Sequence, residues 1–154
     1  MFIESAEQGD LKSVSRIHGE CFRNGWSDGE FDAFLQQTCY WLLIARIPRQ
    51  TKRKISGFVL VKQVEDEAEI ISIAVSPDSQ KRGTGQKLLD ETIRRLEKDR
   101  VRILSLDVEE NNAAALSMYR KLGFREVNRR ESYYTPISSK DALSAALVMQ
   151  LDLG

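Results

Sequence analysis

Apolar positions follow two different periods along the chain, and these periods predict strands that alternate with helices. Short runs rich in β-branched and aromatic residues indicate strands, whereas apolar residues that recur every three or four positions indicate helices. The expected strands are Phe2 to Ser5, Trp41 to Ile47, Ile55 to Val64, Glu69 to Val75, Val101 to Val108, Phe124 to Tyr134 and Leu143 to Leu151.

Polar residues with capping propensity mark the starts of the expected helices. Asp10 is a candidate N-cap, and Ser27 with Glu30 has the spacing of a capping box. Gly123 is a natural stop for the last helix. The expected helices are one that Asp10 opens, one from Ser27 to about Gln37, one from Gln86 to Leu96 and one that Asn111 and Asn112 cap.

The order of these elements is strand, helix, helix, three strands, helix, strand, helix and two strands. Some consecutive strands are joined by helices and others by short turns, so we expect a mixed sheet in an α/β (α+β) fold. A chain of 154 residues is short enough to share one hydrophobic core. We therefore expect a single domain over residues 1–154.

Composition then narrows the classes of function. Hydrophobic residues make up 42% and charged residues 30% of the chain, which is typical of a globular protein and not of a disordered one. The formal net charge of zero argues against a strongly electrostatic nucleic-acid binder. No apolar run has the length of a membrane span, and the N-terminus lacks a signal-peptide pattern. We expect a cytoplasmic protein with no membrane partner.

The residues that usually bind metals are scarce. Cys21 and Cys39 are the only cysteines, without the spacing of a metal site, and we expect them to be reduced thiols. His18 is the only histidine and falls on the apolar face of the first helix, where packing explains its position. We therefore expect no metal and no histidine-based catalytic triad.

One polar segment stands out between an apolar strand and an amphipathic helix. It contains Lys81, Arg82, Gly83 and Gly85 and leads directly into the helix that starts near Gln86. Backbone N–H groups at a helix start have no internal acceptor, and the helix dipole favours anions there. The glycines let the backbone come close to a phosphate, and the two cations add positive charge. The segment is either an anion-binding loop or simply a turn.

Neither common phosphate motif matches this segment. In a Rossmann fingerprint the third glycine would fall at Leu88, and no Gly-Lys-Ser/Thr follows as in a Walker A motif. The sequence Gln80-Lys81-Arg82-Gly83-Thr84-Gly85 instead resembles the pyrophosphate-binding loop (Gln/Arg-x-x-Gly-x-Gly/Ala) of the GCN5-related N-acetyltransferases. The resemblance extends to Ile73-Ala74-Val75-Ser76-Pro77 and to Asn111 through Phe124, and it covers most of the chain.

The resemblance implies a fold and a cosubstrate. The family fold has a central mixed, mostly antiparallel sheet with helices on both faces. The strand that ends near Val75 splays from the strand that ends near Val108, and acetyl-CoA lies in the V-shaped gap between them. The cofactor-binding residues that the resemblance implies are Ile73, Ala74, Val75, Lys81, Arg82, Gly83, Thr84, Gly85, Gln86 and Asn112.

Two residues match the catalytic positions of the family. Tyr119 matches the general acid that protonates the departing thiolate, although the apolar stripe with Met118 and Leu122 also explains its place. Asp107 matches the general base, where close relatives have a glutamate. Because aspartate is one methylene shorter, a water relay is the expected route to the amine. A polar residue at an exposed strand end is the alternative interpretation of Asp107.

The expected acceptor is the N-terminal α-amino group of a protein, most simply an alanine-starting ribosomal protein. Trp26, Tyr133 and Tyr134 are the residues that the resemblance assigns to acceptor binding, and an insertion near Ser144 is expected to reshape this groove. The alternatives are an enzyme for small amines and a silent module that binds acyl-CoA. We expect a monomer or weak dimer that does not bind nucleic acid directly.

Overall fold

The structure, a computed structural model, describes residues 1–48, 54–131 and 145–154. Its strands are β1 (Phe2–Ser5), β2 (Tyr40–Ile47), β3 (Lys54–Val64), β4 (Glu67–Val75), β5 (Ile103–Glu109), β6 (Arg125–Arg130) and β7 (Ala146–Asp152). They form one sheet in the order β1-β2-β3-β4-β5-β7-β6. Only the β4–β5 pair is parallel and the other neighbours are antiparallel, which confirms the mixed, mostly antiparallel sheet.

The helical segments also follow the expected order. They are the short 3-10 turns η1 (Gln8–Asp10) and η2 (Pro77–Ser79) and the helices α1 (Leu11–Cys21), α2 (Asp28–Leu35), α3 (Thr84–Lys98) and α4 (Ala113–Leu122). α3 starts at Thr84, two residues before the predicted Gln86, because Gly83 already ends the loop in a left-handed conformation. None of the described helices is long and apolar enough to cross a membrane.

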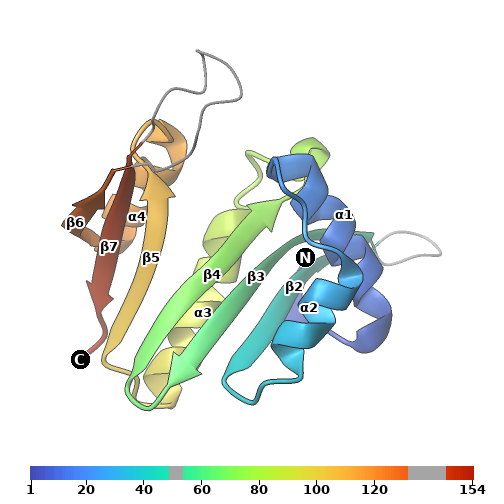
Figure 1. The fold of residues 1–154 in the computed structure, drawn as a ribbon, viewed down its shortest axis with the longest axis horizontal. Coiled ribbons are helices and arrows are strands. Elements are labelled where there is room, and N and C mark those ends of the chain that lie inside the picture. The colour runs from blue at the N-terminus through green and yellow to red at the C-terminus, as the bar shows by residue number, and fades with distance from the viewer. Residues whose placement is uncertain (49–53, 132–144) are drawn as a thin grey trace.

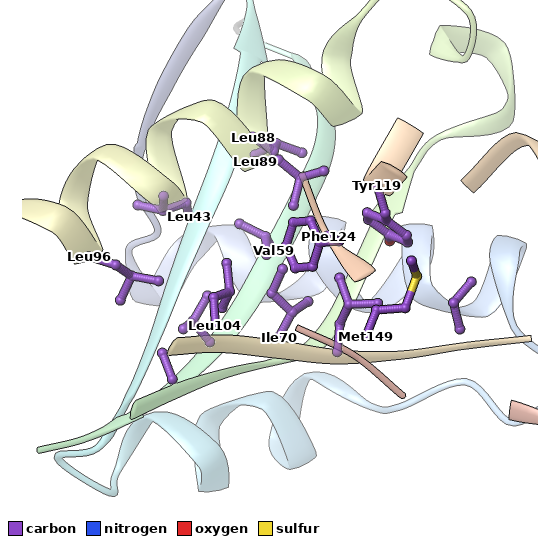
Figure 2. Packing of buried hydrophobic residues seen from close by; sticks show 14 of the residues in the cluster. Leu43, Val59, Ile70, Leu88, Leu89, Leu96, Leu104, Tyr119, Phe124 and Met149 are labelled. Atoms are coloured by element: carbon purple, nitrogen blue, oxygen red, sulfur yellow. The ribbon is translucent and has the colours of Figure 1, made fainter. Parts of the chain in front are cut away.

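Helices cover the two faces of the sheet in pairs, as Figure 1 shows. α3 and α4 pack on one face, where Leu88 and Leu96 meet strand residues such as Val59 and Leu104 (Figure 2), and Leu116 of α4 belongs to the same cluster. α1 and α2 pack on the other face, whose core residues include Val14, Ile17, Phe31, Ile44, Phe58 and Leu60. The predicted inward face of α1 is confirmed, and burial of these apolar side chains is the main stabilising term of the fold.

The two central strands part halfway along their length. β4 and β5 pair only from Glu67 opposite Ile103 to Ile70 opposite Leu106. Beyond that point β4 continues to Val75 beside β3, while β5 continues to Glu109 beside β7. Figure 1 shows the two strands diverging towards the ends at which α1 finishes and α4 begins. This divergence is the predicted splay.

A β-bulge lies at the point of divergence. Leu60 of β3 pairs with Ser72, but the next residue, Val61, pairs with Ile70, so Ile71 of β4 is an extra residue. A bulge bends its strand and increases the local twist. The bend therefore turns the end of β4 away from β5, one residue after their last pair.

Asp10 occupies the predicted N-cap position of α1, but its side chain makes no capping hydrogen bond to that helix. It accepts a 2.8 Å hydrogen bond from the Glu7 backbone N–H and two of 2.7 Å from Arg46 of β2. The carboxylate thus ties η1 to the sheet, an interaction between distant parts of the chain that local spacing cannot reveal. Ser27, by contrast, accepts from the Glu30 N–H as predicted.

Candidate active site

Backbone donors of β4 point to the side from which β5 has departed. The N–H of Ser76 donates to the Ser56 carbonyl in β3 at 2.8 Å. Because successive N–H groups of an extended strand alternate in direction, those of Val75 and Ile73 point away from β3. Among the described residues no strand pairs with β4 on that side beyond Ile70. The end of β4 therefore offers two backbone donors that an extended ligand can use.

The carbonyl of Val75 joins the two segments that flank this strand end. It accepts a hydrogen bond from Gln80 Nε2 at 3.1 Å and another from Cys21 Sγ at 3.3 Å. The glycine-containing segment and the end of α1 therefore meet at the last residue of β4. Burial raises the pKa of the Cys21 thiol, with a smaller contribution from Glu20, so Cys21 is a packed neutral thiol.

The segment between β4 and α3 has the geometry of an anion site. Gly83, with φ of +78°, is the N-cap, and the first bond inside α3 runs from the Lys87 N–H to the Gly83 carbonyl. The N–H groups of Thr84, Gly85 and Gln86 therefore have no acceptor within the helix. The helix dipole adds a partial positive charge at the same place.

The Thr84 side chain gives the most direct indication that a ligand binds at this segment. It is buried, and its Oγ1 has no hydrogen-bond partner in the part of the chain that the structure describes. An unpaired buried hydroxyl is costly unless a ligand completes it. Lys81 and Arg82 next to it are exposed and free to reach an anion. These donors fit a pyrophosphate group.

An ion pair fixes the start of the same segment. Asp78 of η2 accepts hydrogen bonds from Lys54 of β3 and from the Ser76 hydroxyl. Lys54, with Ser76, holds the pKa of the Asp78 carboxyl well below its usual range. The carboxylate is therefore charged at neutral pH, and it anchors η2 to the sheet.

Tyr119 lies where the two central strands part. Only 5% of it is exposed, and its ring centroid is 5.6 Å from that of Phe124 (Figure 2). The same cluster contains Ile70 and Leu106, the last paired residues of β4 and β5. Burial raises the pKa of Tyr119 to about 12. The phenol is therefore protonated at neutral pH and can act as a hydrogen-bond donor.

Asp107 faces the other side of the sheet. Its neighbours Leu106 and Val108 point into the core beneath α3 and α4, so alternation turns Asp107 to the opposite face. There the carboxylate lies 3.4 Å from Arg130 Nη1 of β6, an ion pair that the sequence did not reveal. Glu109 lies two residues further along the same face and is also exposed.

Asn112 has a structural duty of its own. It is the N-cap of α4, and its Oδ1 accepts a 3.2 Å hydrogen bond from the Ala115 N–H. The predicted cap is therefore confirmed, and contact between Asn112 and a cofactor stays a prediction. The other predicted cofactor residues lie together at the end of β4 and the start of α3.

Trp26 acts as a hydrophobic staple and remains partly exposed. It precedes the N-cap Ser27 and packs against Phe31 of α2, with ring centroids 5.6 Å apart. This matches the staple arrangement between N′ and N4. Its acceptor-binding role stays a prediction. Tyr133, Tyr134 and the insertion near Ser144 lie outside the described residues.

Metal ligands do not gather anywhere in the described part of the chain. No group of three or more His, Cys, Asp and Glu side chains there could hold a metal ion. The described residues of the site offer backbone donors, one buried phenol, one carboxylate and a helix start.

Comparisons with known proteins agree with this geometry. Residues 11–124 match the Acetyltransferase (GNAT) family. The ribosomal protein bS18-alanine N-acetyltransferase of Escherichia coli K12 is 35% identical over 150 residues, which cover 97% of this chain and 98% of the relative. The protein described as a putative enzyme of the same name in Bacillus subtilis 168 is 27% identical over 136 residues, 87% of this chain and 86% of the relative.

A solved structure extends the likeness to three dimensions. The crystal structure of the ribosomal-protein-S18-alanine N-acetyltransferase from Escherichia coli superposes with a TM-score of 0.85 at 33% identity. The match covers 99% of this chain and 94% of the other. With the family match over most of the chain, the conclusion is direct: this chain belongs to the acetyltransferase (GNAT) family and is an acetyl-CoA-dependent N-acetyltransferase.

Proposed function

We propose that this enzyme acetylates the N-terminal α-amino group of a protein and that its acceptor is the alanine that begins ribosomal protein bS18. The observation that carries the proposal is the end-to-end similarity to the bS18-alanine N-acetyltransferase of Escherichia coli. The similarity reaches 98% of the relative, so it is not confined to the cosubstrate loop.

The described residues divide the work of holding acetyl-CoA. The N–H groups of Thr84 to Gln86 and the Thr84 hydroxyl would bind the pyrophosphate, with Lys81 and Arg82 beside it. The N–H groups of Ile73 and Val75 would bind the extended arm and polarise the acetyl carbonyl, as donors of an oxyanion hole do. Bound acetyl-CoA supplies the thioester whose acetyl carbon receives the amine.

The two candidate catalytic side chains lie on opposite faces of the sheet at the splay. Asp107 faces the side on which α1 and α2 lie, from which we expect the amine to approach, and takes the proton of the attacking amine through a water. Tyr119 lies on the side of α4 and donates a hydrogen bond to the sulfur as the carbon–sulfur bond breaks. The amine would therefore approach from one face of the sheet, and the thiolate would leave on the other.

A weak base is sufficient for an α-amine and insufficient for lysine. The α-amino group has a pKa of about 7.7–8.0, whereas the lysine amine has a pKa of about 10.4. At a given pH the neutral lysine amine therefore costs about 3 kcal/mol more than the neutral α-amine. A carboxylate that acts through water, as proposed for Asp107, favours the N-terminus.

Product mapping tests the proposal. A peptide with the N-terminal sequence of bS18 and an internal lysine is incubated with the enzyme and acetyl-CoA, and tandem mass spectrometry locates the acetyl group. We expect acetylation of the first residue and a free lysine. A peptide whose N-terminus is already blocked serves as the control and should remain unmodified. Predominant lysine acetylation, or turnover of small amines only, would contradict the proposal.

The proposal also covers the setting of the reaction. We infer that the enzyme works in the cytoplasm as a monomer or weak dimer. Gel filtration with and without the bS18 peptide measures the oligomeric state, and a stable higher oligomer would contradict this inference.

A further inference from the structure

The segment of residues 22–27, here called the α1–α2 loop, folds back onto the helix that precedes it. A Cβ added to Gly25 would lie 2.9 Å from the Cα of Gly19 in α1, so the two backbones are in direct contact. Cys21, the last residue of α1, donates to the Val75 carbonyl at the end of β4. The loop therefore starts beside the splay, on the face of the sheet towards which Asp107 points.

Two hydrogen bonds fasten Trp26 of this loop to α1. The Ser15 hydroxyl donates to the Trp26 carbonyl at 2.7 Å, and the Trp26 backbone N–H donates to Nδ1 of His18 at 3.0 Å. Because Nδ1 accepts a hydrogen bond, the imidazole is neutral and carries its proton on Nε2. Both backbone polar groups of Trp26 are thus bonded to side chains one turn apart on one helix.

Ring contacts fix the same pair of residues. The rings of His18 and Trp26 are stacked, with centroids 4.4 Å apart and planes inclined by 16°. Phe22, Phe31 and Phe58 complete an aromatic enclosure around His18, which is 3% exposed. Helix periodicity explains the burial of His18, but it does not explain a histidine at a site that a leucine or phenylalanine would fill.

We propose that His18 is a positioning residue, which in its neutral form holds Trp26 and the α1–α2 loop in place as one wall of the acceptor-binding site. This role rests on the proposed function, because it concerns the peptide and not acetyl-CoA. His18 acts through Trp26 and touches neither the reacting amine nor the thioester. Fixing the loop in advance lowers the entropy that peptide binding would otherwise lose.

Protonation of His18 should release the loop. Burial lowers the pKa of His18 below its ordinary 6.5, and the nearby charge of Glu30 on α2 raises it by less. Glu30 is the charged group acting on the ring, since the phenylalanine rings around it carry no charge. A lowered pKa means that the neutral ring is intact above pH 6.5. The contact is lost only as the pH falls through the folded-state pKa, which lies below 6.5.

Substitutions separate the hydrogen bond from the ring stack. His18→Phe keeps an aromatic ring under Trp26 and removes the acceptor, whereas His18→Asn keeps an acceptor near the Nδ1 position and removes the ring. Arg16→Ala is the matched control, because Arg16 is exposed on the same helix. We expect the Phe variant to raise the peptide KM about tenfold with little change in kcat or in CoA affinity by calorimetry. The Asn variant should lie between it and the wild type.

The pH dependence distinguishes positioning from a general packing defect. Protonation of the peptide amine affects both enzymes equally and cancels in the ratio of the two KM values. We expect the ratio of Phe-variant to wild-type KM to fall towards one as the pH drops through the folded-state pKa of His18, below 6.5, because the wild type then loses the contact as well. A ratio that is independent of pH would assign His18 to packing alone.

Because His18 is the only histidine, its ring signals in a nitrogen-15 NMR spectrum are unambiguous. We expect a neutral ring protonated on Nε2 at pH 7.5 and a pKa below 6.5. A ring protonated on Nδ1, or an unchanged peptide KM in a folded Phe variant, would overturn the inference. If the wild type acetylates no peptide at all, the proposed function fails, and the NMR result still decides whether His18 holds Trp26.

Discussion

At the scale of single residues, burial decides what Tyr119 can contribute. With a pKa of about 12, its phenol is a much weaker acid than a thiol, whose ordinary pKa is about 8.5. Full proton transfer to the departing thiolate would be uphill by about 3.5 pKa units, or about 5 kcal/mol. Tyr119 is therefore best suited to donate a hydrogen bond that shifts towards the sulfur as charge develops there.

Replacing Tyr119 by phenylalanine should lower kcat about a hundredfold with little change in the peptide KM. The ring still packs on Phe124, so the Tm should change little. In the wild type the raised pKa keeps the phenol protonated up to at least pH 10, so ionisation of Tyr119 should not reduce kcat below that pH. A wild-type rate in the Phe variant would make Tyr119 a core residue only.

Asp107 and Glu109 provide a matched pair for testing the base, since both are exposed and face the same way. Asp107→Asn should lower the rate most clearly at low pH, where the amine is protonated, and Asp107→Glu should keep or raise it. Glu109→Gln should change little. Initial rates with an alanine-starting peptide across a pH series measure all three. Equal rates for the wild type and the Asp107→Asn variant at every pH would defeat the base role.

The sequence could not predict which side chains of the site contact one another. Family motifs singled out Asp107 and Tyr119 as candidate catalytic residues, and helix periodicity correctly predicted that His18 would be packed. The ion pair of Asp107 with Arg130 and the bond from Trp26 to His18 depend on how distant or loosely connected segments meet. Spacing along the chain carries no information on such contacts.

At the scale of elements, the start of α3 contains a buried side-chain hydroxyl, that of Thr84, without a hydrogen-bond partner in the described structure. Thr84→Val removes a buried hydroxyl that has no partner in the described structure and keeps the side-chain shape. We expect the free energy of unfolding to stay equal or rise by about 1 kcal/mol in the free protein. The affinity for CoA should fall about tenfold, or about 1.4 kcal/mol, by calorimetry.

Thr92→Val is the control on the same helix. Thr92 is equally buried, but its Oγ1 donates to the Leu88 carbonyl at 2.8 Å. This variant should lose about 1 kcal/mol of stability and bind CoA as the wild type does. Unchanged CoA affinity in Thr84→Val would show that the hydroxyl does not face the ligand.

The elements themselves were largely predictable because each carries a local signal. The apolar stripe from Gln86 to Leu96, the cap at Asn112 and the stop at Gly123 predicted helix limits to within about two residues. The bulge at Ile71 was not predictable, since its sequence reads as an uninterrupted apolar strand. A bulge is a property of the pairing between two strands, and one strand alone does not show it.

At the scale of the whole molecule, two parts of the sheet are joined by a short seam. The β1-β2-β3-β4 part meets the β5-β7-β6 part through four paired positions, supported by the core under α3 and α4. The order of strands and helices gave the mixed sheet, and the family motifs gave the splay. The side on which each helix packs required the structure.

Acetyl-CoA that binds along the end of β4 and the start of α3 should stabilise this arrangement. At a concentration one hundred times its Kd, a ligand adds about 2.7 kcal/mol to the free energy of unfolding. For a chain of this size we expect Tm to rise by about 5–10 °C, measured by scanning calorimetry. A Gly83→Val variant that cannot admit the pyrophosphate should show no such rise. Equal rises in both proteins would place the ligand elsewhere.

Because β4 carries one extra residue, Ile71, the site depends on the number of residues in this strand as well as on their identity. Deleting this one position would let β4 pair without interruption with both neighbours, and the backbone donors at its end would be taken up by β5. Every side chain assigned to chemistry would survive such a deletion. Substitution scans of this protein would therefore underestimate the importance of the region, and single-residue deletions and insertions are the changes by which its binding function is most easily lost.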